Sequence, residues 1–253
     1  MAPMERSLAG RAVVVTRPRA AAGPLAAALG ARGARVVFAP LIRTVPPRSW
    51  RRLDAGLKGL DGFDAVAFSS VPAVDSVFAR AKTLRLRLKK PRVVGAVGKA
   101  TAAALAARGW KAAVVPEDAR AAGLARSLKL PPGARVLLPR AERGLEVLPR
   151  SLAASGAIVA RAAAYRTVAD AAGKRALKRA LASGADAAFF ASGSAAAGAK
   201  SLRRAFRGCA VVAIGPTTAA ALTAVGLRPA AVAKTPEVGS LVAAIEAALR
   251  RRP

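Results

Sequence analysis

Hydrophobic residues fall into short continuous runs that alternate with longer alanine-rich segments. Continuous apolar runs, without a polar residue at every second position, are typical of parallel strands covered on both faces. The expected strands cover residues 12–16, 35–38, 64–68, 92–97, 112–115, 135–138, 157–161, 186–190, 210–214 and 230–233. The expected helices cover residues 20–32, 50–59, 72–82, 99–108, 121–129, 143–155, 173–182, 194–205, 216–225 and 238–250. This alternation predicts right-handed βαβ units and an α/β fold.

Glycine and proline mark the expected helix ends. Gly33, Gly109, Gly156 and Gly226 each follow a helix and precede a strand, where a left-handed backbone ends a helix easily. Pro24 is expected in a first helical turn, where its missing N–H costs little.

The sequence contains an internal repeat. The paired segments are 96–124 with 213–241, 13–37 with 136–160, and 63–70 with 185–192. Because alanine is so common in this chain, the alignment rests on the matched glycine, threonine, leucine and arginine positions. Two related α/β units predict a two-lobed protein with a cleft between the lobes.

Two segments interrupt the alternation at equivalent points of the two halves. Residues 39–47 and 160–170 look extended, and both contain Arg-Thr-Val. We expect them to cross between the lobes. The expected organisation is lobe 1 at 1–39 plus 168–253, lobe 2 at 46–160, and linkers at 40–45 and 161–167.

Composition limits the available chemistry. Hydrophobic residues make up 54% of the chain and aromatic residues 4%, so we expect cores of alanine, valine and leucine. The chain has one cysteine and no histidine, which excludes internal disulfides, the common zinc sites and imidazole catalysis. Cys209 opens an apolar run and is expected to pack in a core.

The chain is strongly basic, with a formal net charge of +30. Such a charge attracts nucleic acid, an anionic membrane or a polycarboxylate substrate. The basic residues are scattered along the chain, which favours solvated faces over one dedicated basic surface.

No segment predicts a membrane span. The longest apolar stretch, 209–227, is broken by Gly215 and Gly226, and it reads as a strand, a turn and a helix. The first eleven residues lack the pattern of a signal peptide, so we expect a cytoplasmic protein.

Hydroxyl-bearing turns follow several expected strands, where parallel sheets bind ligands. The candidate binding residues are Thr16, Arg17, Ser69, Ser70, Gly98, Thr101, Ser192, Ser194, Gly215, Thr217 and Thr218. Each turn lies at the start of an expected helix, whose free N–H groups suit carboxylates or phosphates. Capping alone explains any single turn, but several turns facing one cleft favour binding. Among the cations, Arg17, Arg140 and Lys99 lie nearest to strand ends.

Several common catalytic motifs are absent. The sequence has no P-loop, no G-x-G-x-x-G and no G-x-S-x-G, and no carboxylate pair has general acid/base spacing. A nucleotide-dependent or metal-dependent enzyme is therefore poorly supported. Asp64 and Asp186 precede strands and are interpreted as structural. Tyr165, the only tyrosine, is either a packed aromatic or a hydroxyl donor in the cleft.

Six segments carry a family resemblance. They are AFSSVPAV (67–74), AVGKATAAAL (96–105), AAAYRTV (162–168), FFASGSAA (189–196), AIGPTTAAAL (213–222) and TPEVGSLVAAI (235–245). In this order they resemble the successive motifs of the uroporphyrinogen-III synthase family, over about the whole chain. The resemblance implies two flavodoxin-like lobes with parallel sheets, a two-stranded linker, and an active site in the inter-lobe cleft.

The resemblance also implies an activity. Family members cyclise the linear tetrapyrrole hydroxymethylbilane with inversion of the terminal ring, giving uroporphyrinogen III and water in haem biosynthesis, without a cofactor. By motif, Tyr165 assists loss of the substrate hydroxyl, and the paired hydroxyl turns bind substrate. The sequence departs from the family at Ser69 and Ala191, where threonine is common, and at Gly193, where proline is usual. We expect a monomer that binds a small polycarboxylate and no membrane, and whose charge allows nucleic acid without requiring it.

Two other classes of protein stay open at this point. A catalytically inactive two-lobed relative would bind polyanions such as nucleic acid through their phosphates, although the scarcity of aromatic residues argues against base stacking. A hinged two-lobed protein that binds a small ligand has the same outline, but no export signal supports it.

Overall fold

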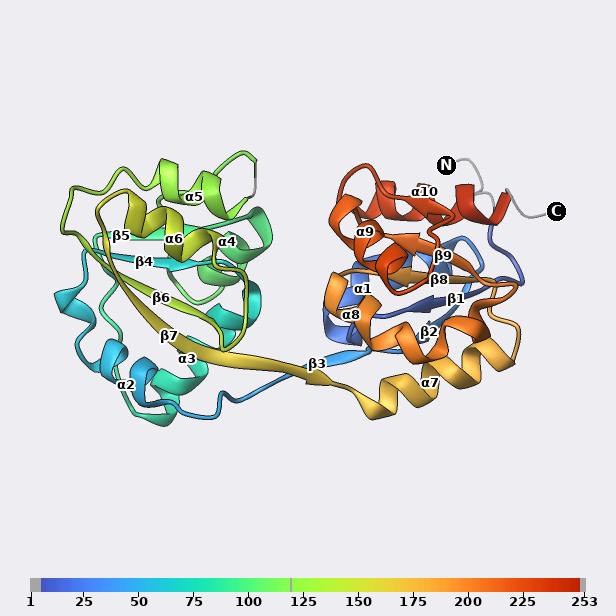
Figure 1. Ribbon diagram of the computed structural model, residues 1–253, viewed down its shortest axis with the longest axis horizontal. Helices are drawn as coiled ribbons and strands as arrows, with labels where there is room; N and C mark the ends of the chain where they lie inside the picture. The colour runs from blue at the N-terminus through green and yellow to red at the C-terminus, as the bar shows by residue number, and fades with distance from the viewer. Residues whose placement is uncertain (1–5, 119, 251–253) are drawn as a thin grey trace. The chain divides into compact units, whose positions relative to one another are not determined.

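The computed structural model describes residues 6–118 and 120–250 and divides the chain into two compact units (Figure 1). Unit 1 combines residues up to Arg43 with residues from Val168 onward, and unit 2 holds Thr44–Thr167. Each unit contains one five-stranded sheet with helices on both faces. The expected α/β class is confirmed, with two mostly parallel sheets. Residues 1–5, part of the N-terminal segment in which no signal peptide is expected, lie outside the described residues.

Unit 1 is a parallel sheet between two helical layers. Its strands are β1 (Ala12–Val15), β2 (Arg35–Phe38), β8 (Ala187–Phe190), β9 (Ala210–Ala213) and β10 (Ala231–Val232). Its helices are α1 (Arg19–Ala31), α7 (Ala171–Ala182), α8 (Gly193–Ala199), η2 (Lys200–Phe206), α9 (Pro216–Ala224) and α10 (Val238–Arg250). The sheet order β10-β9-β8-β1-β2, with parallel neighbours throughout, is that of flavodoxin-like folds.

Unit 2 repeats this architecture. Its strands are β3 (Ile42–Val45), β4 (Ala65–Phe68), β5 (Val93–Ala96), β6 (Arg135–Ala141) and β7 (Ile158–Ala169). Its helices are α2 (Arg51–Lys58), η1 (Leu60–Gly62), α3 (Val71–Thr83), α4 (Lys99–Ala106), α5 (Ala121–Ser127) and α6 (Val147–Ala154). The sheet order is β3-β7-β6-β4-β5, and β7, β6, β4 and β5 are parallel. The unit boundaries fall inside β3 and β7, so these strands carry the chain between the units.

The strands are apolar throughout because both sheet faces are covered. Val13 and Val15 of β1 pack into the core beneath α1 and α10, and Val14 packs into the core beneath α7, α8 and α9. Alternate side chains of a strand point to opposite faces, so a doubly covered strand needs apolar residues at every position. The cores are mostly alanine, valine and leucine, but Phe68 and Phe189 are also fully buried.

The sequence repeat is visible in the topology. By the repeat, β2, β1, β8 and β9 correspond to β7, β6, β4 and β5, and both groups of strands occur in the same spatial order. The expected structural role of two aspartates is confirmed in both copies. Asp64 accepts the backbone N–H of Arg135 at 2.8 Å, and Asp186 accepts that of Ala12 at 2.8 Å, which ties each central strand to its neighbour.

Most expected elements lie where the hydrophobic pattern predicts them. The four helix-ending glycines have φ values of +87°, +77°, +85° and +79°, which confirms their left-handed backbone. No helix in the part of the chain that is described combines the length and apolarity needed to cross a membrane. Cys209 is half-buried and packs against a core of unit 1.

Four details of the prediction are wrong. Residues 112–115 form no strand but one bridge between Val114 and Gly95, because Pro116 follows directly and has no N–H to extend the ladder. Pro24 lies inside α1, since that helix already begins at Arg19. The helix expected over 194–205 divides into α8 and η2, and the one expected from residue 143 begins at Val147 after a turn.

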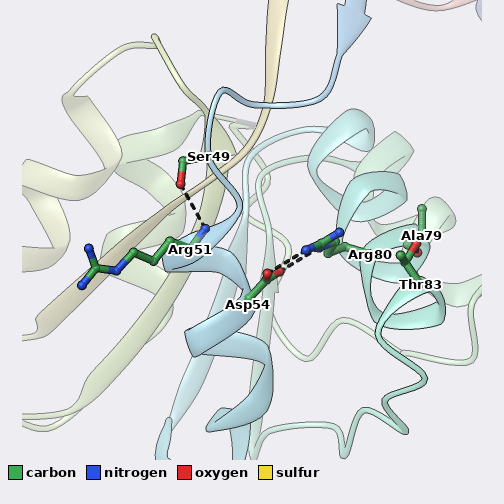
Figure 2. Close-up of polar contacts among 6 residues, drawn as sticks. All are labelled: Ser49, Arg51, Asp54, Ala79, Arg80 and Thr83. Carbon is green, nitrogen blue, oxygen red and sulfur yellow. Dashed lines mark hydrogen bonds and ion pairs between the residues drawn. The ribbon is translucent and has the colours of Figure 1, made fainter.

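A bidentate ion pair between Arg80 and Asp54 joins helices α2 and α3 of unit 2 (Figure 2). The Arg80 guanidinium donates to the two Asp54 oxygens at 2.8 and 2.7 Å and lies 4.9 Å from the centre of the Trp50 ring. At the start of α2, Ser49 accepts the Arg51 N–H at 3.3 Å. At the end of α3, Thr83 donates to the Ala79 carbonyl at 3.1 Å. The hydrogen bond from Arg80 is the main cause that lowers the pKa of Asp54.

This ion pair predicts a pH-dependent stability. Because the pKa of Asp54 is lower in the folded than in the unfolded state, its contribution is complete above the unfolded pKa and disappears as pH falls through the folded one. Urea unfolding should find Asp54→Asn less stable than wild type at neutral pH, with the difference shrinking below about pH 4. The control is Asp75→Asn, whose partner Arg108 is exposed and which should change stability little. A pH-independent difference for Asp54→Asn would contradict the prediction.

Candidate active site

A pocket of about 280 Å³ lies at the carboxyl end of the unit 2 sheet. Ser69 and Ser70 follow β4, Val97 follows β5, and Tyr165 lies on β7 opposite the end of β6. Since β5, β4, β6 and β7 are neighbours, their carboxyl ends meet at one edge. Unit 2 thus brings together three of the predicted site residues, one of them the predicted catalytic tyrosine.

The two central hydroxyls of this pocket contact each other. The Tyr165 hydroxyl lies 3.1 Å from the Ser70 Oγ, and either atom can donate. Ser70 is also the N-cap of α3, where its Oγ accepts the backbone N–H of Ala73 at 3.4 Å. Capping fixes the serine side chain, so the serine in turn orients the phenol. Ser69, in the same turn, also lines the pocket and is exposed.

Arg140 lines this pocket but is already paired within unit 2. The residue is 9% exposed, and its guanidinium donates to Glu146 at 2.8 Å and to the Leu145 carbonyl at 3.0 Å. Arg161 shares the same carboxylate at 2.7 Å. The hydrogen bond from Arg140 is the main cause that lowers the pKa of Glu146. Arg140 therefore holds the turn after β6, and no spacing rule predicts its pairing with Glu146.

The segment after β5 lies at the edge of this pocket. Gly98 is the N-cap of α4, and Thr101 is buried in the first turn of that helix. Lys99 is exposed. Only Val97 of this segment lines the pocket, so these predicted residues adjoin the hydroxyl pair without contacting it.

Unit 1 gathers the other predicted binding residues at its own carboxyl edge. Thr16 and Arg17 follow β1, the serine turn follows β8, and the Gly215 turn follows β9, in three adjacent strands. Thr16 is buried and donates to the Phe189 carbonyl at 2.9 Å, which joins the ends of β1 and β8. Its hydroxyl is therefore engaged inside the sheet.

The turns after β8 and β9 supply helix starts. Ser192 caps α8 by accepting the Ala195 N–H at 3.2 Å, just as its repeat counterpart Ser70 caps α3. Ser194 and Thr217 are exposed, whereas Thr218 is buried in the first turn of α9. The exposed hydroxyls and the free N–H groups at these helix starts are available to an anionic ligand.

Arg17 is the counterpart of Arg140 in unit 1. The repeat aligns the two arginines, each directly after a central strand. Arg17 is half-buried, burial lowers its pKa, and it makes no ion pair with any acidic residue that the structure describes. A partly desolvated guanidinium without a carboxylate partner is suited to bind one from a ligand. In residues 6–118 and 120–250, no group of three or more metal-ligating side chains is arranged to hold a metal ion.

Fold and site together define a class of protein. The chain is a duplicated, flavodoxin-like α/β protein whose two units both present helix starts with hydroxyl side chains at the carboxyl edges of their sheets. The sequence profile of uroporphyrinogen-III synthase HemD matches residues 23–243. The chain belongs to the uroporphyrinogen-III synthase family, as its motifs predict.

Two curated relatives and two solved structures are similar to this chain. The uroporphyrinogen-III synthase of Synechococcus elongatus is 35% identical over 166 residues, which are 64% of this chain and 63% of the relative. A putative uroporphyrinogen-III synthase of Methanothermobacter thermautotrophicus is 31% identical over 157 residues, 61% of this chain and 62% of the relative. The matches span less than two thirds of these relatives.

The structural likeness covers nearly the whole chain. A mutant uroporphyrinogen III synthase of Thermus thermophilus has a TM-score of 0.65 at 25% identity, covering 96% of this chain and 100% of that one. The uroporphyrinogen-III synthetase of Helicobacter pylori, at 20% identity, has a TM-score of 0.58 with the same coverage and shares the fold. None of these relatives supports the alternative of a polyanion-binding protein.

Proposed function

We propose that the protein is a uroporphyrinogen-III synthase, which closes hydroxymethylbilane with inversion of the terminal ring and releases water. The observation that carries this proposal is the Tyr165–Ser70 hydroxyl pair, which lies at the carboxyl edge of the unit 2 sheet in a chain of this family. The pair supplies a proton donor next to a pocket, and the reaction needs one for its leaving hydroxyl.

The proposed reaction begins with loss of the substrate hydroxyl. Tyr165 donates its proton as the C–O bond breaks, so that water leaves and an electrophilic azafulvene cation and a tyrosinate form. A carbon–carbon bond then forms at the substituted α position of the last ring, and the bond from that position to its methylene bridge breaks. The bridge carbon rejoins the ring at the free α position, which inverts the ring, and the proton lost from that position restores the phenol. The protein mainly holds a folded conformer, so no histidine is needed.

Substrate carboxylates are the proposed partners of unit 1. Acetate and propionate groups carry the charge that Arg17 and the helix starts of α8 and α9 attract. In this proposal the two units act as the lobes predicted from the sequence, with the linkers at 40–45 and 161–167 and the substrate in a cleft between them. The protein works as a cytoplasmic monomer, without a cofactor.

The deciding experiment uses freshly generated hydroxymethylbilane. This compound closes without enzyme to uroporphyrinogen I, so the measurement is the ratio of isomers III and I after incubation with the purified chain. We expect isomer III to predominate. A product that contains only isomer I would refute the proposed function.

Arg17 is expected to contribute to substrate affinity. Replacing it with methionine keeps much of its packing but removes a charge-assisted hydrogen bond, which should raise KM about tenfold or more. The control is Lys178→Met, which removes the same charge from the exposed face of α7 and should leave KM unchanged. Equal effects of the two variants would show that only the overall charge matters.

A further inference from the structure

Tyr165 lies at an irregularity of the unit 2 sheet. Arg140 on β6 is opposite Ala163 on β7, but the next residue, Ala141, is opposite Tyr165. Ala164 is therefore an extra residue on β7, which is the definition of a β-bulge. In a regular strand, adjacent side chains point to opposite faces of the sheet. Here Tyr165 packs against the same core in which Ala164 is buried.

The bulge explains why the phenol reaches Ser70. Bulges re-aim side chains and are common beside active sites. The core shared by Ala164 and Tyr165 is the one beneath α3, and Ser70 is the N-cap of that helix. The contact of 3.1 Å between the two hydroxyls thus depends on the extra residue.

Glu142 follows β6 directly and contacts the bulged part of β7. Its backbone N–H donates to the Tyr165 carbonyl at 2.7 Å. Its carboxylate accepts the Arg48 backbone N–H at 2.9 Å and the Arg48 Nη1 at 2.6 Å. The Arg166 Nε donates to the Pro46 carbonyl at 3.1 Å, which fastens the next residue of β7 to the same segment.

Hydrogen bonds from Arg48 are the main reason why this carboxylate stays ionised. The Arg48 backbone N–H is the largest cause that lowers the pKa of Glu142, followed among the favourable causes by the Arg48 side chain and the charge of Arg166. Burial acts in the opposite direction. The acceptor that both Arg48 groups need is therefore present at neutral pH.

The other half of the repeat lacks both side chains of this arrangement. Glu142 aligns with Arg19 and Tyr165 with Ile42, so neither the carboxylate nor the phenol has a counterpart. The equivalent strands β1 and β2 pair from Ala12 to Val15, so this ladder ends before the position that corresponds to the bulge. The glutamate and the tyrosine thus occur together in one half only, although both halves share the surrounding fold.

We propose that Glu142 is a positioning residue for Tyr165: anchored by Arg48, it fixes the bulge that aims the phenol at Ser70. The inference rests on the proposed function in so far as Tyr165 acts in catalysis. Glu142 touches no reacting atom in this mechanism. It limits the displacement of the phenol from the position in which it donates its proton. Turnover is sensitive to such a displacement.

The single tyrosine provides a direct test in the full chain. Carbon-13 labelling of tyrosine gives one aromatic spin system, and that signal belongs to Tyr165. Glu142→Ala should shift and broaden this signal, with the urea midpoint nearly unchanged. With hydroxymethylbilane, kcat should fall on the order of tenfold while KM stays within about twofold. Glu142→Asp should restore part of both readouts.

Controls separate positioning from general effects of charge. Asp61→Asn removes an exposed carboxylate from the same unit and should leave the tyrosine signal and kcat unchanged. Arg48→Gln should reproduce the Glu142→Ala effects, and the double variant should lose little more, because both act through one contact. An unmoved tyrosine signal in Glu142→Ala, or a raised KM at unchanged kcat, would overturn the proposal. If wild type forms only isomer I, the proposed function fails, and the tyrosine signal still decides the positioning role.

Discussion

Turnover of hydroxymethylbilane by Tyr165→Phe is expected to fall about 100-fold, because the substitution removes the proton donor of the leaving hydroxyl. Phenylalanine keeps the ring that packs against the core beneath α3, so folding should be unaffected. The measurement is the rate of isomer III formation in single-turnover experiments, together with a urea unfolding curve. An unchanged rate would remove Tyr165 from the mechanism.

Ser70→Gly is the companion variant. Glycine is an acceptable N-cap and costs α3 only a few tenths of a kcal/mol, whereas the hydroxyl that contacts Tyr165 is lost. We expect a smaller loss of kcat than in Tyr165→Phe, because the phenol remains but is less well oriented. A larger loss than in Tyr165→Phe would indicate that the serine, not the tyrosine, carries the proton transfer.

The largest expected effect on stability is that of Gly173→Ala. Gly173 lies in the first turn of α7, and an added Cβ would overlap the backbone carbonyl of Pro40. Backbone atoms cannot turn away as a side chain can, so we expect unit 1 to lose about 3 kcal/mol. Gly198 of α8 also approaches this segment, since its Cβ would lie 3.1 Å from that of Leu41. The segment after β2 is therefore packed closely against two helices.

Gly30→Ala is the matched control for that prediction. Gly30 lies on the exposed side of α1, and a Cβ there would meet no atom within 4 Å beyond its neighbours in the helix. Alanine is the better helix former, so this variant should be about 0.5–1 kcal/mol more stable in urea unfolding. A similar change in both variants would show that the close approach of α7 to Pro40 does not limit stability.

Much of the fold follows from local patterns. The strands of both sheets are continuous apolar runs because helices cover both faces, and such runs are visible in the sequence without any tertiary information. The repeat is also visible in the sheets, where four corresponding strands have the same spatial order, whereas the fifth strands, β10 and β3, lie at opposite edges. Local patterns failed at Val114, where a proline limits pairing to one bridge, and in 194–205, where the helix changes to a 3-10 turn.

Local patterns also predicted only part of the candidate site. The hydroxyl turns follow from the rule that ligands bind where parallel strands end, and each predicted turn does follow a strand. Their roles in substrate binding stay predictions, as does the cleft between the lobes. The pairing of Arg48 with Glu142 joins residues 94 positions apart, and no spacing rule indicates it. No spacing rule indicates either that Arg140 forms an ion pair with Glu146, or that Arg17 has no such partner among the described residues.

The sequence alone determined the α/β class, the duplicated halves and the motifs of the family, because hydrophobic period, helix caps and terminating glycines act over a few neighbouring residues. The tertiary structure alone decided which hydroxyls meet and where the phenol points. Tyr165 faces Ser70 because one extra residue on β7 reverses the expected alternation, and a glutamate directly after the neighbouring strand holds it there. A single unpaired residue changes which face a side chain occupies, and only the register between strands reveals it.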